Sequence, residues 1–460
     1  MISLDMTPAL AHRPPTEHTA MKDADLYLRQ FDHLERQAAG RHPAWVFPLR
    51  KAGLARFAEL GLPTTRHEDW RFTNLAPLAQ LPFRPVFDYS RDGVSEAALG
   101  GFPFAGLAGD RLVFINGHFS RELSAVRPHP GGVRVESLAA ALAADTGLVE
   151  RHIGRYARDE ACAFTALNTA FFTDGVFLHA PAGQSLPDPV HLVFISTEGS
   201  AHPRNLIIAE PHSRLTILES HVSLAQAPAA TNAVTELVVG EGAVVEHARF
   251  LDDRAQSFHI GTLQAHLGRQ CNFLSHSLAL GARLSRYNIN TTLDGEGVEC
   301  VLNGLYLANA EQLVDHHMVV DHARPHCASH EYYNGILAGR ARGVFHGRIL
   351  VRKHAQKTDA KQTNKNLLLS DEATVDTKPQ LEIYADDVKC THGATVGQLN
   401  QESIFYLRSR GIGLETARRM LIHAFAGEII DRIRHAPLRE ELDRLVWNRL
   451  EQHEQVCLTT

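Results

Sequence analysis

A thiol and an imidazole lie two residues apart near the C-terminal end of the chain, at Cys390 and His392. They belong to the stretch Pro379–Gly397, in whose second half apolar and polar residues alternate. Successive side chains of a strand point to opposite faces, so this alternation predicts a strand that carries both groups on one face. Two residues of strand span roughly 6.6 Å, which lets the two groups reach one common ligand atom. The pair therefore indicates a candidate soft-ligand site.

The remainder of that face is apolar, which leaves two interpretations open. A cysteine on an apolar strand face is commonly a small buried hydrophobe, and a histidine beside it is commonly a hydrogen-bonded core residue. An apolar face of a strand is also expected to be covered, either by another part of the same chain or by a strand of a partner protein. The apolar residues that share the face are Val388, Ala394 and Val396.

The densest group of polar side chains lies between residues 315 and 330. A metal site needs three or four converging ligands, yet the adjacent His316 and His317 must point to opposite faces of a strand. The segment that begins at His330-Glu331 fails the H-E-x-x-H zinc pattern, because Asn334 replaces the second histidine. We therefore predict a structural role for this group. Its members are Asp315, His316, His317, Asp321, His322, His326, Cys327 and His330.

The chain shows no self-contained catalytic machinery. It has no G-x-x-x-x-G-K-[ST] phosphate loop, no G-x-G-x-x-G after a strand and no G-x-S-x-G. The adjacent Asp386 and Asp387 could serve acid–base chemistry on a sugar, but neighbours on a strand face opposite ways. This pair is the only support for a β-helical glycan-active enzyme.

The composition of the chain excludes several classes of protein. The 460 residues are 44% hydrophobic and 21% charged, as in soluble globular proteins, and a net charge of −6 argues against a nucleic-acid partner. No apolar run approaches the ~18 residues of a membrane span, and the first twenty residues resemble a loose arm rather than a secretory signal. The six cysteines form no C-x-x-C pair, which argues against a disulfide framework. We expect a cytoplasmic protein without nucleic-acid or membrane partners.

A long repetitive region must position the candidate site. Residues 1–163 are mostly helical but mixed in pattern, residues 164–400 alternate as short strands, and residues 401–460 return to helical spacing. The stretch Gly240–Val245 recurs as Gly295–Cys300, with a turn at Leu267-Gly268 near the midpoint. A repeat of about 28 residues is typical of a solenoid.

Such repeats predict a mainly β fold, in which stacked strands of a β-helix bury columns of apolar residues. A propeller or a sandwich is the competing architecture. The edge of a stack presents unpaired backbone groups to a partner strand. In residues 401–460, two apolar stripes separated by Pro437 predict a helical hairpin with one face against the strands, whose other face could dock a protein.

Several stretches resemble the SufB/SufD family of iron–sulfur cluster assembly proteins. They are HEDWRFTNL at His67–Leu75, RLVFINGHF at Arg111–Phe119, FTALNTAFFTDGVF at Phe164–Phe177 and nearly all of residues 335–410. In the last region, KCTHGATVG is similar to the SufD branch of the family rather than to the SufB branch. Residues 1–60 and 200–330 carry little of the resemblance.

The resemblance implies a right-handed parallel β-helix flanked by N-terminal and C-terminal helical segments. It also implies a non-catalytic scaffold that pairs with a SufB-like paralogue through β-helix edges and binds a SufC-like ATPase through its C-terminal helical region. His392 would supply a ligand to a transient iron–sulfur cluster, or to iron, at the interface between the paralogues. Cys390 lies in the same motif, and thiolate and imidazole both suit iron. No permanently bound cofactor is implied.

Two alternatives remain open for a member of this family. The SufB-type scaffold role would require a cysteine that accepts sulfur, and Cys390 is the only candidate in the motif. An uncovered apolar edge also predicts that the isolated chain can form a homodimer.

Overall fold

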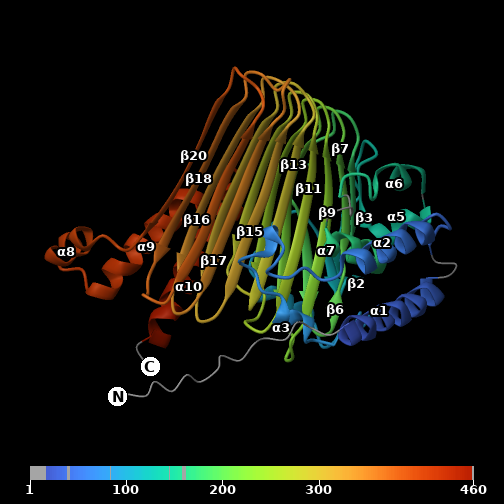
Figure 1. Ribbon diagram of the computed structural model, residues 1–460, viewed down its shortest axis with the longest axis horizontal. Helices are drawn as coiled ribbons and strands as arrows, with labels where there is room; N and C mark the ends of the chain where they lie inside the picture. The colour runs from blue at the N-terminus through green and yellow to red at the C-terminus, as the bar shows by residue number, and fades with distance from the viewer. Residues whose placement is uncertain (1–16, 39–41, 83, 145, 158–161, 458–460) are drawn as a thin grey trace, which may run out of the picture.

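The computed structural model describes residues 17–38, 42–82, 84–144, 146–157 and 162–457. At its centre is a β-solenoid of about eight turns, in which the chain passes alternately through two stacked ten-stranded sheets (Figure 1). Most N-terminal helices lie at one end of this body, and the C-terminal helices lie at the other end and against the strands (Figure 1). The predicted mainly β fold and stacked parallel strands are confirmed, and the parallel pairing of successive turns excludes a propeller or an antiparallel sandwich.

From β7 onward the chain alternates between the two sheets, so neighbours in a sheet are every second strand of the chain. The first sheet has the order β2-β1-β5-β8-β10-β12-β14-β16-β18-β20, and the second has the order β19-β17-β15-β13-β11-β9-β7-β4-β3 with β6 beside β9. In the first sheet the strands are β1 (Asp110–Ile115), β2 (His118–Ala125), β5 (Val190–Ser196), β8 (Arg214–Ser223), β10 (Val244–Asp252), β12 (Asn272–Ala279), β14 (Glu299–Ala308), β16 (Ala328–Leu337), β18 (Asp359–Leu368) and β20 (Lys389–Gly397). In the second they are β3 (Arg134–Ser137), β4 (Val176–Ala180), β6 (Ser200–Ala201), β7 (Arg204–Ala209), β9 (Ala230–Val239), β11 (Phe258–Leu267), β13 (Leu284–Leu293), β15 (Leu313–His322), β17 (Arg342–Val351) and β19 (Thr374–Ile383).

Helices precede and follow the solenoid. The N-terminal ones are α1 (Glu17–Ala38), α2 (Val46–Leu60), the 3-10 helix η1 (Glu68–Trp70), α3 (Ala76–Ala79), α4 (Glu96–Gly100), α5 (Leu138–Ala144), α6 (Thr146–His152) and α7 (Ala163–Phe171). The C-terminal ones are α8 (Gln401–Ser409), α9 (Leu414–Ile430) and α10 (Ala436–Cys457).

The register of the strands confirms the predicted repeat. Val244 of β10 lies opposite Asn272 of β12, which lies opposite Glu299 of β14, so one turn takes about 28 residues here. At one corner of each turn a residue has a positive φ, and its N–H donates to a carbonyl of the next turn, as from Gln270 to Glu296 at 2.9 Å. These bonds hold the corners together as the strand ladders hold the sheets. The corner residues are Gly183, His212, Gly242, Gln270, Gly297, His326 and Lys357.

The main core lies between the two sheets. Leu263, Ile289 and Met318 are paired across β11, β13 and β15, and none has exposed surface. Burial of each such side chain contributes about 2 kcal/mol, so the columns of apolar residues are the main source of stability along the stack. A β-helix needs these columns because a single turn cannot enclose a core.

The C-terminal helices cover the outer face of the first sheet. Ile429 of α9 and Val446 of α10 belong to one buried cluster with Phe250 and Leu305 of the strands. Asn334 of β16 donates to the carbonyl of Phe425 in α9 at 2.9 Å, which fixes the hairpin on the sheet. The predicted helical hairpin against the strands is confirmed.

The division into residues 1–163, 164–400 and 401–460 stays a prediction. Helix α7 begins at its first boundary, and β1, β2 and β3 extend the two sheets from within the N-terminal part. Most of the predicted N-terminal arm lies outside the described residues. Among the described helices, none is both long and apolar enough to cross a membrane.

Candidate functional site at the open end of the solenoid

The stretch that carries Cys390 and His392 forms the last strand of the solenoid. Within the described part of the chain, β20 pairs only with β18, and β19 pairs only with β17. These two strands form the end of the body that lies opposite α1 and α2 (Figure 1). We call this end the open end. The strand and its alternating pattern were predicted correctly from the sequence.

Cys390 lies at the border between the core and this end. It pairs with Ala360 of β18 and packs, half-buried, against the core between the sheets. Its side chain therefore points to the inside of the last turn. Burial raises the pKa of the Cys390 thiol, so it is a weaker nucleophile at neutral pH than a free thiol. Iron that displaces the proton would still find a thiolate ligand.

His392 lies one step further along the same inner face and is exposed. It pairs with Gln362 of β18, whose side-chain amide donates to the carboxyl of Glu331 at 2.6 Å. Burial raises the pKa of Glu331 to about 7. The imidazole therefore stands above a column of buried polar groups, at a place that another molecule can reach.

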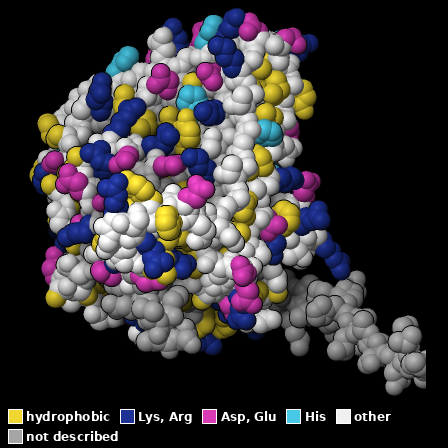
Figure 2. All heavy atoms as spheres, turned by 90° about the vertical axis from the view of Figure 1, so that its left-hand side faces the viewer, with side chains coloured by type: hydrophobic (Ala, Val, Ile, Leu, Met, Phe, Trp, Pro, Cys, Tyr) yellow, Lys and Arg dark blue, Asp and Glu magenta, His cyan; other side chains and the backbone are white. Residues whose placement is uncertain are grey.

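Beyond Cys390, no described part of the chain covers this face. Residues 391–397 are exposed on the last rung, and half of the surface of Val396 is accessible. Ile383 and Tyr384, at the end of β19, are exposed as well. Figure 2 shows this end of the molecule, with hydrophobic side chains scattered among charged groups. The chain itself covers the start of the apolar face, where Val388 and Cys390 pack against the core, and cover of the exposed remainder by a partner stays a prediction.

Helix α8 leads away from β20 at the same end (Figure 1). Its N-cap is Asn400, whose side chain accepts from the backbone N–H of Ser403 at 3.0 Å. Phe405 and Tyr406 on this helix are 75% and 57% exposed. Two adjacent aromatic side chains on a short, exposed helix make a second apolar surface beside the open end.

The other cysteines whose side chains are described offer no comparable site. Cys271, Cys300 and Cys327 are buried within the solenoid, and burial raises the pKa of all three, that of Cys271 to about 12. Cys327 donates to the carbonyl of Gly295 at 3.1 Å. These thiols act as small apolar core residues, and Cys162 lies far away in sequence next to α7.

The polar group between residues 315 and 330 does not form one site. His316 lies inside the solenoid against Tyr306 and Tyr333, whereas His317 lies on the outer face of the second sheet near His346. The prediction that the adjacent histidines point to opposite faces is confirmed. His330, on another sheet, approaches Asp359 at 3.8 Å.

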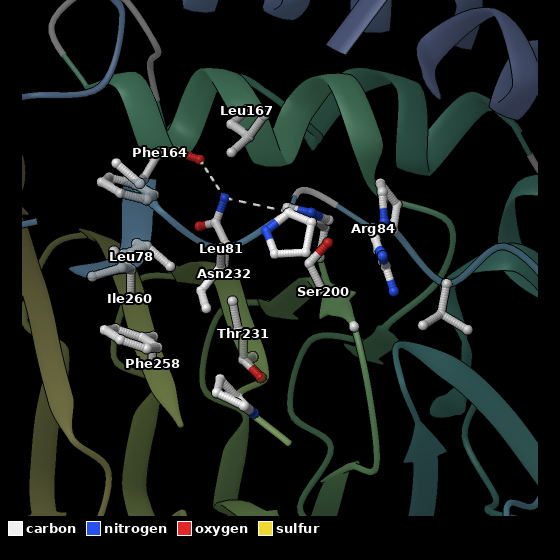
Figure 3. Close-up of a pocket in the computed structure, with 18 of the residues that line it drawn as sticks. Leu78, Leu81, Arg84, Phe164, Leu167, Ser200, Thr231, Asn232, Phe258 and Ile260 are labelled. Atoms are coloured by element: carbon white, nitrogen blue, oxygen red, sulfur yellow. Dashed lines mark hydrogen bonds between the residues drawn. The ribbon is translucent and has the colours of Figure 1, made fainter. Parts of the chain in front are cut away.

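The carboxylate pair does not line a groove for a glycan. Asp386 and Asp387 are exposed in the turn between β19 and β20, and Asp387 forms an ion pair with Lys357. An apolar pocket of about 470 Å³ lies elsewhere, between the N-terminal region and the second sheet (Figure 3). In it, Asn232 donates to the carbonyl of Phe164 at 2.8 Å, and the labelled lining is mostly leucine, isoleucine and phenylalanine. Neither feature brings two carboxyl groups together across a cavity.

Sequence reasoning missed a buried group of acids and histidines inside the solenoid. Glu219 accepts from His221 at 2.7 Å and lies 3.3 Å from His247, and His259 lies 3.0 Å from Asp253. Burial lowers the pKa of His221 to about 4. Polar residues alternate with apolar ones along β8 and β10, and this pattern is visible in the sequence. The sequence does not show, however, whether the polar side of such a strand faces the inside of the solenoid or the solvent.

Comparison with known proteins decides which family this architecture belongs to. Residues 193–425 match the family model described as SUF system FeS cluster assembly, SufBD core domain, and residues 21–192 match that of the SufBD protein N-terminal region. The chain belongs to the SufB/SufD family. It is therefore an iron–sulfur cluster assembly protein of the SUF system.

Full-length relatives agree with this assignment. An iron–sulfur cluster assembly SufBD family protein of Synechocystis is 34% identical over 96% of this chain and 99% of its own length. The iron–sulfur cluster assembly protein SufD of Escherichia coli is 31% identical over 92% of this chain and 96% of its own, and SufD of Bacillus subtilis is 25% identical over 90% and 95%. The resemblance to the SufD branch is thus confirmed.

Proposed function

We propose that the chain is the SufD-type scaffold subunit of an assembly that builds iron–sulfur clusters. In this role it docks a SufB-like paralogue on its open end and supplies His392 as a ligand to the nascent cluster or to iron. The cluster is cargo rather than a resident cofactor. Cys390 is the second proposed ligand, and it is more buried than His392.

One observation carries the proposal. The open end combines an unpaired strand edge, exposed apolar residues and an exposed imidazole above a half-buried thiol. An exposed strand edge with apolar side chains pairs readily with another strand, and such pairing would place the partner directly over His392. A ligand set divided between two chains can release its cluster when the chains separate, which suits a scaffold.

The C-terminal region offers the surface for an ATPase. Phe405 and Tyr406 are exposed aromatic side chains, a composition that is common at the centre of protein interfaces. The chain itself has no phosphate loop, so we propose that ATP hydrolysis belongs to a SufC-like partner and that this subunit is not catalytic. We propose a cytoplasmic location, where thiols stay reduced.

The SufB-type role has less support. Cys390 is the one exposed or half-buried thiol at the open end among the described cysteines, and its raised pKa does not favour attack on a sulfur donor. We therefore propose the ligand role for it. In the absence of the paralogue, two copies of the chain would pair through the same edge.

Co-purification tests the assembly. A tagged chain, co-expressed with the paralogue and the ATPase of the same organism, should retain both. Val396→Lys places a charge on the exposed edge and should release the paralogue, while Phe405→Ala should release the ATPase. Each variant should retain the other partner, which serves as the folding control. Retention of the paralogue by Val396→Lys at the parent level would refute docking on the open end.

A further inference from the structure

A second group of potential metal ligands lies on the outer face of the second sheet, away from the open end. It consists of Asp69 in η1, His317 in β15 and His346 in β17. One ligand atom of each residue lies within 4.8 Å of the others. Among the described residues, no other three His, Cys, Asp or Glu side chains converge in this way. The group unites a segment near the N-terminus with strands more than 200 residues later.

The two histidines are held together by the sheet. His317 and His346 are directly paired in the parallel ladder between β15 and β17, so their side chains share a face. Their rings are 4.2 Å apart at 80° to each other, and both residues are buried. Nε2 of His346 is buried without a hydrogen-bond partner among the described residues. An unpartnered buried nitrogen is costly unless something binds to it.

The carboxylate is held above them by its neighbours. Arg286 donates to the backbone carbonyl of Asp69 at 2.6 Å and stacks on the ring of Trp70 at 3.8 Å. Lys378 binds the carboxylate of Glu68 at 2.6 Å. The Asp69 side chain itself stays 65% exposed, with Oδ1 at 3.7 Å from Nε2 of His317. It can rotate toward an ion, while its backbone is fixed.

The space between these residues fits one ion. A cavity of about 10 Å³ lies there, lined by Asp69, His317 and His346 together with Glu68, Phe72 and Lys378. That is the size of a single water-sized sphere. Ligand atoms around a transition metal at ~2.1 Å are separated by roughly 3.5 Å. Because the three ligand atoms already lie within 4.8 Å of one another, only a small closing movement of the group is needed.

The charges around the site are compatible with a bound cation. The neighbouring cations have carboxylate partners of their own: Arg286 pairs with Asp315, Lys378 with Glu68 and Arg348 with Glu382.

We propose that Asp69, His317 and His346 bind a divalent first-row transition-metal ion. Two imidazoles and one carboxylate leave open positions for water, and this ligand set suits Zn²⁺ and Fe²⁺. The ion joins η1 to the outer face of the second sheet. The site does not depend on the proposed scaffold role, since none of its three proposed ligands lies on β19 or β20.

Metal titration of the full-length chain tests the proposal. The background is Cys390→Ser/His392→Ala, which removes the ligands at the open end. Zn²⁺ is titrated aerobically and Fe²⁺ anaerobically against a competing chelator, and Co²⁺ serves as an absorption probe of the ligand set. We expect one bound ion without the intense near-ultraviolet band of a cobalt–thiolate bond.

Single substitutions decide whether these residues hold it. Asp69→Asn changes an exposed side chain and His346→Gln a buried one, and each should lower the affinity at least tenfold, because even the loss of an outer partner of a metal ligand costs that much. His354→Gln and Asp386→Asn, both at exposed positions, should leave it unchanged. Equal affinity in Asp69→Asn and the parent, or millimolar binding only, would overturn the proposal, whatever the result of the co-purification.

Discussion

Glu331 is the buried acid nearest to the proposed ligand. It lies on β16 with no exposed surface, and its one hydrogen bond in the structure comes from Gln362, the residue beneath His392. Burial raises its pKa to about 7 from the 4.5 of a free glutamate. The folded protein therefore binds a proton that the unfolded chain releases between these values.

This proton makes stability depend on pH. The contribution of protonated Glu331 is fully present below about pH 4.5 and is lost as the pH rises through about 7, which amounts to about 3 kcal/mol. Glu331→Gln removes the titration and can keep the hydrogen bond to Gln362. Urea unfolding should therefore show that the variant gains stability relative to the parent between pH 5 and pH 8.

The control for this comparison is Glu299→Gln, which removes an exposed carboxylate from the same sheet. A difference between Glu331→Gln and the parent that is the same at pH 5 and pH 8 would show that the buried acid does not titrate in this range.

The two proposed ligands could be predicted from the sequence, whereas their surroundings could not. Alternation alone placed Cys390 and His392 on one face, because a strand has a period of two. It could not show that the face belongs to the last turn, where no further strand within the described ranges covers it. The group of Asp69, His317 and His346 could not be predicted from the sequence for a different reason. Its members become neighbours only when the chain returns to the second sheet.

Among the elements, the stacked strands depend on residues that leave room for a neighbour. Gly304 of β14 is paired with Tyr333 of β16, and a Cβ at Gly304 would lie 2.0 Å from Cε1 of that ring. Tyr333 is fully buried and packs against Phe345, so its ring has no free space to move into.

Gly304→Ala should therefore destabilise the fold by about 2 kcal/mol through overpacking. Gly427→Ala is the matched control, because a Cβ at this position of α9 meets nothing within 4 Å. It should stabilise the protein by about 0.5–1 kcal/mol through helix propensity. Chemical denaturation of both variants would measure the contrast, and equal stability of the two variants would show that the strands can move apart to accept the methyl group.

The solenoid repeat was visible in only part of the sequence, and the corners explain why. Gly242 and Gly297 occupy the left-handed corner position in two turns and produce the repeated Gly-Glu-Gly motif. In other turns the same backbone position is filled by Gln270, His326 or Lys357. The stacked hydrogen bonds hold these residues at a positive φ despite its cost of about 1 kcal/mol, so the geometry repeats where the sequence does not.

In the whole molecule, the two ends of the solenoid differ. At the N-terminal end, β2 and β3 run antiparallel to their neighbours and helices cover the adjacent faces. At the other end, β19 and β20 end the sheets without a covering strand among the described residues. The resemblance of the sequence to its family led us to propose that a partner docks at this end, whereas the repeat alone predicted edges without telling which one is free.

Cluster assembly by a histidine variant is the most direct test of the proposed role. His392→Ala removes an exposed side chain, so the protein should fold and should still co-purify with the paralogue and the ATPase. In anaerobic reconstitution with iron and sulfide, this assembly should form iron–sulfur cluster, measured by absorption and Mössbauer spectra, at less than about a tenth of the parent level. The exposed His354→Ala should match the parent. Full cluster formation by the His392→Ala assembly would contradict the ligand role of the open end.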